Sequence, residues 1–242
     1  MITAYIYDFT KNDITSSCTY NAYLGFKFLG ADLKIVQNSL QIEDDNPENI
    51  VVGHVDFVVD RLKKLSVPIQ VFDYPEELTE FLGRKVWIST INQVANELPF
   101  AFVKPKDDNK LFTGRVIRST KDLIGTGSQS GDIAVYCSEV VNMVAEFRTF
   151  VRYGKIIGIK QYSGNYRLKP DYDTIEKAVK QFKNCPNAYS IDFCVTDDNK
   201  TLLVEVNDGY AIGNYGLDVI DYAKFLYTRW AQLTNSKDWY NF

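Results

Sequence analysis

Strand-like and helix-like blocks alternate along the first hundred residues. Runs rich in β-branched and aromatic residues predict strands at ITAYIYDF, ADLKIVQ, IVV, IQVFDY and KVWIS. The blocks between them predict helices at SSCTYNAYLGFKFLG, HVDFVVDRLKKL, PEELTEFLG and TINQVANEL. Asp13 is the expected cap of the first helix, and Pro75 and Gly83 are expected to bound the third. This alternation predicts a small α/β domain with a mostly parallel sheet.

The pattern changes after Pro99, where strands follow one another with fewer helices between them. Strands are predicted at FAFVKP, GRVIRS, IAVYCSEVV, AEFRTFVRY, KIIGIKQYSG, AYSIDFCVT and TLLVEVN. Two helices are predicted, at YDTIEKAVKQFKN and from about Asp218 to Leu233. Strand runs with few helices indicate an α+β domain built largely on antiparallel sheet. We therefore expect a boundary between Leu98 and Pro99, which divides the chain into domains of residues 1–98 and 99–242.

Composition places the chain among ordinary globular proteins. It has 242 residues, 45% of them hydrophobic and 24% charged, with a formal net charge of −4. The sequence contains no Lys/Arg cluster, so it gives no clear nucleic-acid signal. A basic leader is lacking at the N-terminus, and no stretch approaches the ~20 apolar residues of a membrane span, which predicts a cytoplasmic location.

Cysteine and histidine offer little catalytic chemistry. The four cysteines, which form no CxxC motif, are expected to be free thiols in a reducing compartment: Cys18, Cys137, Cys185 and Cys194. The chain has one histidine, His54, in the run VVGHVDFVV. A single histidine argues against a Ser/His or Cys/His triad, and we expect it to pack in the structure.

A cluster of oxygen-bearing side chains is expected near the end of the chain. Glu205 and Asn207 lie two residues apart in LLVEVN, so in a strand they point to the same face. A hairpin turn at DDNK would place Asp192 opposite Glu205, because the two are equally far from the turn. Such a set suits a magnesium ion that also holds a polyphosphate, although each residue alone is equally typical of an ordinary strand end.

Three basic residues lie within otherwise apolar strands of the same region: Lys104 in FAFVKP, Arg148 in AEFRTFV and Lys160 in KIIGIKQY. Such a residue is costly to bury without a partner. They could contact phosphate, or each could be exposed or ion-paired. The polar loop of residues 105–114 could close over phosphates, although it contains no GxxxxGK[ST] motif.

These motifs together carry a resemblance to a known family. The segments FVKP, SEVVNMVAEFR, IDF and VEVN with a following glycine-rich loop, in that order, resemble the ATP-grasp superfamily over roughly residues 100–217. The sequence looks most like the small ATP-grasp domain proteins of bacteria and phages. The resemblance implies a pre-ATP-grasp-like α/β domain, followed by an ATP-grasp domain of two α+β sub-lobes with the nucleotide between them.

The resemblance also implies site residues. Lys104 matches the lysine that contacts the nucleotide phosphates. Glu139, Val140 and Val141 match the hinge whose backbone reads adenine, and Glu146 matches the acidic residue on the ribose hydroxyls. The remaining matches are the magnesium ligands Asp192, Glu205 and Asn207, and the catalytic basic residues Arg148 and Lys160. ATP and Mg²⁺ are thus the implied cofactors.

One position departs from the family pattern. Many members carry an arginine two residues before the metal-binding aspartate, where it stabilises the transition state, and Ser190 stands there in this chain. Either Arg148, Arg167 or Arg115 takes over this role, or catalysis is weak or absent.

The resulting hypothesis is an ATP- and Mg²⁺-dependent carboxylate–amine ligase that acts through an acylphosphate on small-molecule or peptide substrates. Two alternatives stay open at this point. One is a nucleotide-binding regulatory or interaction protein without turnover, and the other is an ATP-grasp kinase of a small molecule. The sequence identifies neither the acceptor nor the oligomeric state.

Overall fold

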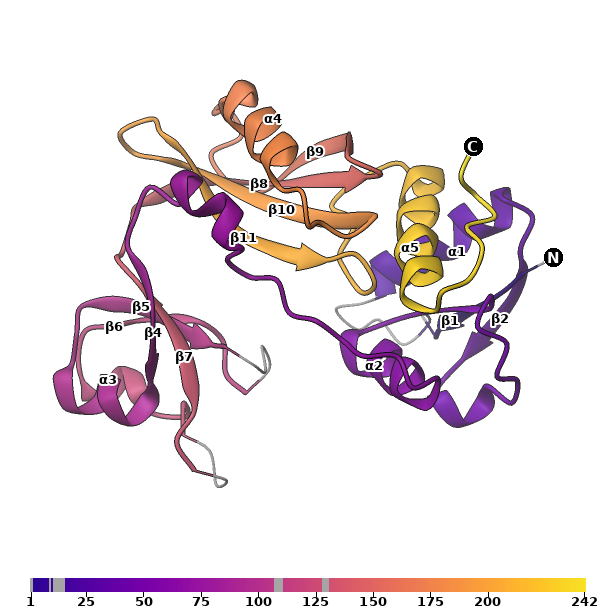
Figure 1. Cartoon of the computed structure of the whole chain (residues 1–242), viewed down its shortest axis with the longest axis horizontal. Coiled ribbons are helices and arrows are strands. Elements are labelled where there is room, and N and C mark those ends of the chain that lie inside the picture. The colour runs from indigo at the N-terminus through magenta and orange to yellow at the C-terminus, as the bar shows by residue number, and fades with distance from the viewer. Residues whose placement is uncertain (1, 9, 11–15, 107–110, 128–130) are drawn as a thin grey trace.

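The computed structural model describes residues 2–8, 10, 16–106, 111–127 and 131–242. They form three sheets, which are arranged along the long axis of the molecule in Figure 1. The mixture of a small α/β unit and antiparallel α+β units confirms the predicted fold class. Within these residues, no helix has both the length and the apolar character needed to cross a membrane. Asp13, the expected cap of the first helix, lies outside the described residues.

The first sheet is parallel, with strand order β2-β1-β3. Its elements are β1 (Thr3–Tyr7), α1 (Ser16–Phe28), β2 (Asp32–Val36), the short 3-10 helix η2 (Ser39–Gln41), β3 (Ile50–Val52) and α2 (Val55–Lys64). The alternation that the sequence predicts for this region is therefore confirmed up to α2. His54 caps α2, because its Nδ1 accepts a hydrogen bond from the backbone N–H of Phe57. The histidine thus has the packing role that the sequence favours.

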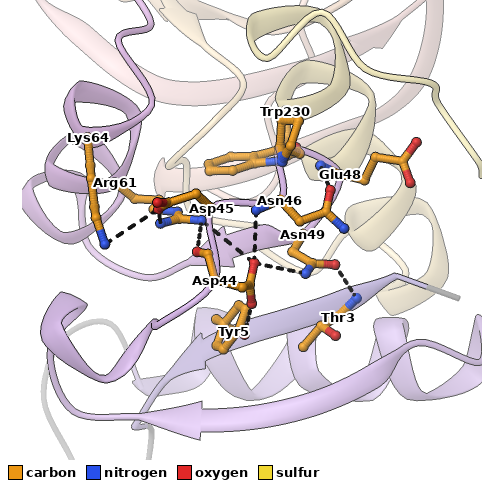
Figure 2. Close-up of polar contacts among 11 residues, drawn as sticks. Thr3, Tyr5, Asp44, Asp45, Asn46, Glu48, Asn49, Arg61, Lys64 and Trp230 are labelled. Atoms are coloured by element: carbon orange, nitrogen blue, oxygen red, sulfur yellow. Dashed lines mark hydrogen bonds and ion pairs between the residues drawn. The ribbon is translucent and has the colours of Figure 1, made fainter.

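A buried arginine ties the first sheet to the segment that precedes β3, as Figure 2 shows. Arg61 donates to Asp45 Oδ1 at 3.1 Å and to the backbone carbonyl of Asp44. The Asp44 carboxylate in turn accepts the hydroxyl of Tyr5. Trp230 of the last helix donates from its indole to the carbonyl of Pro47, at 2.8 Å. These contacts fix residues 44–47 against both ends of the chain.

The segment after α2 differs from the prediction. IQVFDY was expected to be a strand, and this prediction is wrong, because the segment forms a single bridge, between Asp73 and Val206. Proline at residues 68 and 75 bounds the segment, and prolines lack the N–H that a ladder needs. It crosses from the first sheet towards the rest of the molecule (Figure 1) and ends in the 3-10 helix η3 (Glu76–Phe81).

The second sheet is antiparallel, with strand order β4-β7-β5-β6. Its elements are β4 (Val86–Thr90), α3 (Ile91–Glu97), β5 (Ala101–Pro105), β6 (Arg115–Ile117), η4 (Thr120–Leu123) and β7 (Ala134–Ser138). β4 and α3 were grouped with the N-terminal domain in the sequence, whereas β4 pairs with β7 here. A boundary between Leu98 and Pro99 would divide this sheet, and one before β4 would keep it whole.

The third sheet is also antiparallel, with strand order β11-β10-β8-β9. Its elements are β8 (Met143–Arg152), β9 (Lys155–Gly164), α4 (Tyr172–Gln181), β10 (Ala188–Thr196), β11 (Thr201–Asp208) and α5 (Val219–Leu233). α4 covers one face through Ile175, Ala178 and Val179, which pack with Tyr189 and Ile191 of β10. α5 covers one end of the opposite face and also packs on α1 (Figure 1). The rest of that face is left for polar side chains.

Candidate nucleotide site

A row of charged side chains crosses the open face of the third sheet. β10 and β11 form the hairpin that the sequence predicts, with Asp192 opposite Glu205. On its other side β10 pairs with β8, and Asp192 lies opposite Arg148. Directly opposed residues share a face of the sheet, so the three charges form one row. Asn207 lies two residues beyond Glu205, and its Nδ2 donates to Glu205 Oε1 at 3.1 Å. The expected convergence of Asp192, Glu205 and Asn207 is therefore present.

Arg148 and Asp192 form a buried bidentate ion pair. Arg148 Nε donates to Oδ1 at 2.9 Å, and its Nη2 donates to Oδ2 at 2.7 Å. The two side chains are 8% and 2% exposed. Burial raises the pKa of Asp192 to about 6, against the opposing effect of the Arg148 guanidinium, and the nearby Glu205 and Glu146 add to the rise. The pair is thus held by geometry in a region where negative charge is crowded.

Lys104 reaches the same row from the second sheet. Its Nζ donates to Glu205 Oε2 at 2.8 Å and to Asp73 Oδ1 at 2.7 Å, and it lies 4.6 Å from the ring centre of Tyr74. Burial alone would lower the pKa of Lys104, but Glu205, Tyr74 and Asp73 raise it above its ordinary value. The pKa of Glu205 is lowered, because the Lys104 ammonium outweighs the effect of burial. Both groups are therefore charged near neutral pH.

Two tyrosines cover Arg148. Tyr162 of β9 and Tyr215 of the loop after β11 stack with ring centres 4.9 Å apart. The guanidinium lies 4.8 Å from the Tyr215 ring centre and 5.7 Å from that of Tyr162. Tyr162 also donates its hydroxyl to Glu146 Oε2 at 3.0 Å. Glu146, the residue expected on the ribose, thus presents its carboxylate to a hydroxyl group on this face.

The expected hinge directly follows β7. The backbone N–H of Glu139 donates to Lys85 O at 3.0 Å, and the N–H of Lys85 donates to the Glu139 carboxylate at 2.9 Å. Contacts from residues 139–141 to a base would therefore come from their carbonyls or from the N–H groups of Val140 and Val141. These two residues are half-buried and lie between the second and third sheets along the chain.

A cavity of about 390 Å³ lies between β5 and β11. It is lined by Phe102, Lys104, Pro105, Phe112, Thr113, Gly114, Glu205 and Asn207. Gly114 is required for the close packing of its wall, since a Cβ there would lie 2.5 Å from Phe102 Cζ. The predicted closing loop of residues 105–114 lies partly outside the described residues, and its role stays a prediction. The cavity brings a buried cation and two oxygen-bearing side chains to one opening.

The donor set fits a magnesium ion, although it is a modest one. Among residues 2–8, 10, 16–106, 111–127 and 131–242, no group of three or more His, Cys, Asp or Glu side chains is arranged to hold a metal. The candidate set has two carboxylates and one carboxamide, which are hard oxygen ligands. Four carboxylates, those of Asp73, Glu146, Asp192 and Glu205, lie around the cations Lys104 and Arg148. The excess of negative charge favours a further cation.

The other predicted basic residues lie in different places. Lys160 is opposite Arg148 in the β8–β9 register and is half-buried, so it lies on the site face. Arg115 donates to the carbonyl of Ile124, and Arg167 donates to the hydroxyl of its neighbour Tyr166. Of the three arginines considered as replacements at position 190, Arg148 is therefore the one in contact with Asp192.

The sequence did not indicate three residues of the site. Asp73 and Tyr74 come from the segment that was expected to be a strand, and Tyr215 lies in the loop after β11. Their roles depend on contacts with Lys104 and Arg148 from distant parts of the chain. The one signal available was the aspartate itself, at the end of the apolar run IQVF.

The fold and this site together define a class of protein with a nucleotide-site layout between two antiparallel sheets. Residues 81–225 match a family model described as an ATP-grasp domain, the second family of its clade. The match covers more than half of the chain, so the chain belongs to the ATP-grasp family. The match also begins before β4, and it therefore includes the whole second sheet.

Solved structures with a similar fold have low sequence identity to the chain. D-cycloserine synthetase DcsG has a TM-score of 0.58 and 11% identity, over 95% of this chain and 100% of that one. D-alanine–D-alanine ligase from Bacillus anthracis has a TM-score of 0.56 and 12% identity, over 97% and 98%. N5-carboxyaminoimidazole synthetase from Staphylococcus aureus has a TM-score of 0.56 and 14% identity, over 98% and 78%. A search of curated protein sequences found no match. These similarities show the fold.

Proposed function

We propose that this protein is an ATP- and Mg²⁺-dependent ligase that joins a carboxylate to an amine. The observation that carries the proposal is the meeting of Lys104 and Glu205, from two different sheets, beside the Arg148–Asp192 pair. A cation and oxygen ligands at one cavity are the parts that phosphoryl transfer needs. The names of the proteins with similar folds, which are ligases and synthetases, agree with this reaction class.

In this proposal each group binds one part of the nucleotide. Lys104 contacts the phosphates, the backbone of Glu139, Val140 and Val141 contacts adenine, and the Glu146 carboxylate accepts the ribose hydroxyls. The Tyr162 hydroxyl on Glu146 supports the last role, because it shows a hydroxyl bound where the ribose would bind. The side chains of Asp192, Glu205 and Asn207 would hold magnesium, which neutralises phosphate charge when bound.

The reaction then proceeds in two displacements. A substrate carboxylate oxygen attacks the γ-phosphorus, the bond to the β-phosphate oxygen breaks, and ADP leaves with an acylphosphate formed. The amine nitrogen attacks the acyl carbon, phosphate leaves, and the nitrogen loses a proton. Arg148 and Lys160 lie opposite one another on the site face, and we assign to them the stabilisation of the negative charge on the transferring group.

A second candidate is nucleotide binding without ligation. Ser190 stands where many family members carry an arginine, and it is fully buried with an Oγ that has no hydrogen-bond partner within the described part of the chain. Arg148, the remaining candidate for that role, is committed to Asp192 through two hydrogen bonds. Binding would then regulate a partner rather than drive a reaction.

Calorimetry of Mg²⁺-ATP binding tests the shared premise. Wild type should bind, Glu205→Gln should bind at least tenfold more weakly, and the matched control Glu176→Gln on the exposed face of α4 should bind as wild type does. Equal affinity of wild type and Glu205→Gln would overturn the assignment of Glu205.

An ADP-release screen over amino acids, dipeptides and polyamines separates the two candidates. Release that requires both a carboxylate and an amine, with a product mass equal to their sum less one water, supports the ligase. Tight Mg²⁺-ATP binding with no ADP release for any pair supports the binding protein instead.

A further inference from the structure

Asp73 joins the site from outside both antiparallel sheets. It lies in the segment that leads from the parallel sheet to η3, and its carbonyl accepts the backbone N–H of Val206 at 2.8 Å. Its φ of +31° lies in the left-handed region, which non-glycine residues rarely adopt. At 3% exposure it is nearly as buried as Asp192. A strained, buried aspartate at a cluster of charges is a candidate for a role beyond packing.

The side chain of Asp73 has one described partner. Its Oδ1 accepts the Lys104 ammonium at 2.7 Å, while Oδ2 is buried without a hydrogen-bond partner in the described part of the chain. Burial raises the pKa of Asp73, and Lys104 opposes that rise. Burying this carboxylate is therefore unfavourable, and the contact that offsets it is the one with Lys104.

Lys104 is shared between two carboxylates with different prospects. In the proposed function Glu205 is a ligand of the metal ion, so its Oε2 cannot remain committed to the ammonium alone. Asp73 is held by its backbone to β11 and lies outside the proposed metal set. The ring of Tyr74, which meets Tyr136 edge-on at 5.0 Å, supports the ammonium from a further side.

We propose that Asp73 is a positioning residue, which keeps the Lys104 ammonium at the phosphate position when Glu205 turns to the metal ion. The proposal rests on the proposed function, because it assumes that Lys104 contacts phosphate. Asp73 thereby links the segment from the N-terminal sheet to nucleotide binding. Its replacement affects the phosphates of the nucleotide and leaves the nucleoside contacts unchanged.

Calorimetry with two ligands, Mg²⁺-ATP and adenosine, tests this role. Asp73→Asn keeps the side-chain shape and removes the charge, and it should lower the affinity for Mg²⁺-ATP by about tenfold or more, since hydrogen bonds to charged groups are the strong ones. Adenosine affinity should stay within a factor of two. Asp73→Glu, which retains the charge, should recover part of the loss, and Glu76→Gln, an exposed carboxylate three residues on, should bind both ligands as wild type does.

A double-mutant cycle separates positioning from a purely structural role. If Asp73 acts through Lys104, Asp73→Asn has no further effect on Mg²⁺-ATP affinity in a Lys104→Ala background. Additive losses, or equal losses for ATP and adenosine, overturn the proposal. If Asp73→Asn does not fold, the cycle is run with Asp73→Glu, whose effect must likewise vanish without Lys104.

The same titrations distinguish this inference from the proposed function. If wild type does not bind Mg²⁺-ATP, the proposed function fails and the inference fails with it. If wild type binds, Lys104→Ala weakens ATP binding and Asp73→Asn binds as wild type does, the proposed function stands and the role of Asp73 is rejected.

Discussion

Two regions of this protein hold a buried cation among carboxylates, and they differ in where the carboxylates lie. Arg61 in the first domain is 1% exposed, but the side chains of its partners Asp44 and Asp45 are 37% and 69% exposed. Arg148 in the third sheet is paired with Asp192, whose side chain is 2% exposed. The first cluster keeps its negative charge at the surface, as Figure 2 shows for the loop that carries it. The second keeps both signs inside.

This difference separates a structural cluster from a ligand site. Arg61 also donates to a backbone carbonyl, and its cluster connects the loop at residues 44–49 to β1 and α5. The site cluster instead faces a cavity and carries more carboxylates than cations. A buried ion pair is weak evidence for stability, since hydrophobic residues of similar volume often serve as well. We therefore expect the site pairs to be retained for binding, and the following variants test this expectation.

The largest effect is expected for Arg148→Met. This change leaves the Asp192 carboxylate buried without its partner, and breaking a buried pair in this way costs about 3–5 kcal/mol in the free energy of unfolding. Urea denaturation measures it. The double variant Arg148→Met/Asp192→Leu should regain most of that stability and still fail to bind Mg²⁺-ATP. A stable Arg148→Met single variant would contradict the importance of burial at Asp192.

The next effect is stabilisation by the ligand. Mg²⁺-ATP at a hundred times its dissociation constant should raise the free energy of unfolding by about 2.7 kcal/mol. Arg61→Met should retain this increment, because the Arg61 cluster lies in the first domain, whereas Glu205→Gln should lose most of it. Thermal melts with and without ligand give the increments. If Arg61→Met lost the increment as well, the two clusters would be coupled and the comparison would fail.

A smaller loss of intrinsic stability is expected for Arg61→Met. It removes hydrogen bonds to Asp45 and to the carbonyl of Asp44, at a cost of about 1–3 kcal/mol. The loss is smaller than for Arg148→Met because the two released carboxylates can reach water. Denaturation of both variants under one condition ranks them, and a larger loss for Arg61→Met would reverse the physical argument.

The parts of the site that the sequence could predict are those within one hairpin. A turn fixes the register of its two strands, so the pairing of Asp192 with Glu205 follows from counting around DDNK. The choice of β8 as the other neighbour of β10 depends on tertiary structure, and so the Arg148–Asp192 pair could not be derived. The contact between Lys104 and Glu205 joins two sheets and is equally remote in sequence.

The fold shows the same limit. The parallel β1-β2-β3 unit follows from local alternation, because each strand is followed by its own helix or turn. IQVFDY has the composition of a strand, but it meets β11 at one residue and has no further partner strand in the described structure. β4 was assigned to the wrong neighbours for a related reason, since strand order is decided by packing and its pairing with β7 crosses α3, β5 and β6 in the chain.

The smallest effect concerns Tyr5 of the Arg61 cluster. Burial, together with the hydrogen bond to Asp44, raises the pKa of Tyr5 from 10.0 to about 12. The folded state therefore prefers the neutral phenol, and the stability that it contributes is fully present below pH 10 and is lost as the pH rises through 12. Tyr5→Phe should cost about 1 kcal/mol at pH 7 through loss of the hydrogen bond to Asp44.

Denaturation of wild type and Tyr5→Phe at a series of pH values measures this difference directly. The gap between the two proteins should be constant up to about pH 10 and should shrink above it, because wild type alone carries the phenol that must ionise. Tyr172→Phe, at an exposed position that begins α4, should show no such convergence. The convergence would arise in the structural cluster without any change in the nucleotide site, since Tyr5 contacts Asp44 and lies on β1. A gap that stays constant to pH 12 would show that the phenol is not held neutral by Asp44, and the Arg61 cluster would then lack the buried character on which the comparison with the site depends.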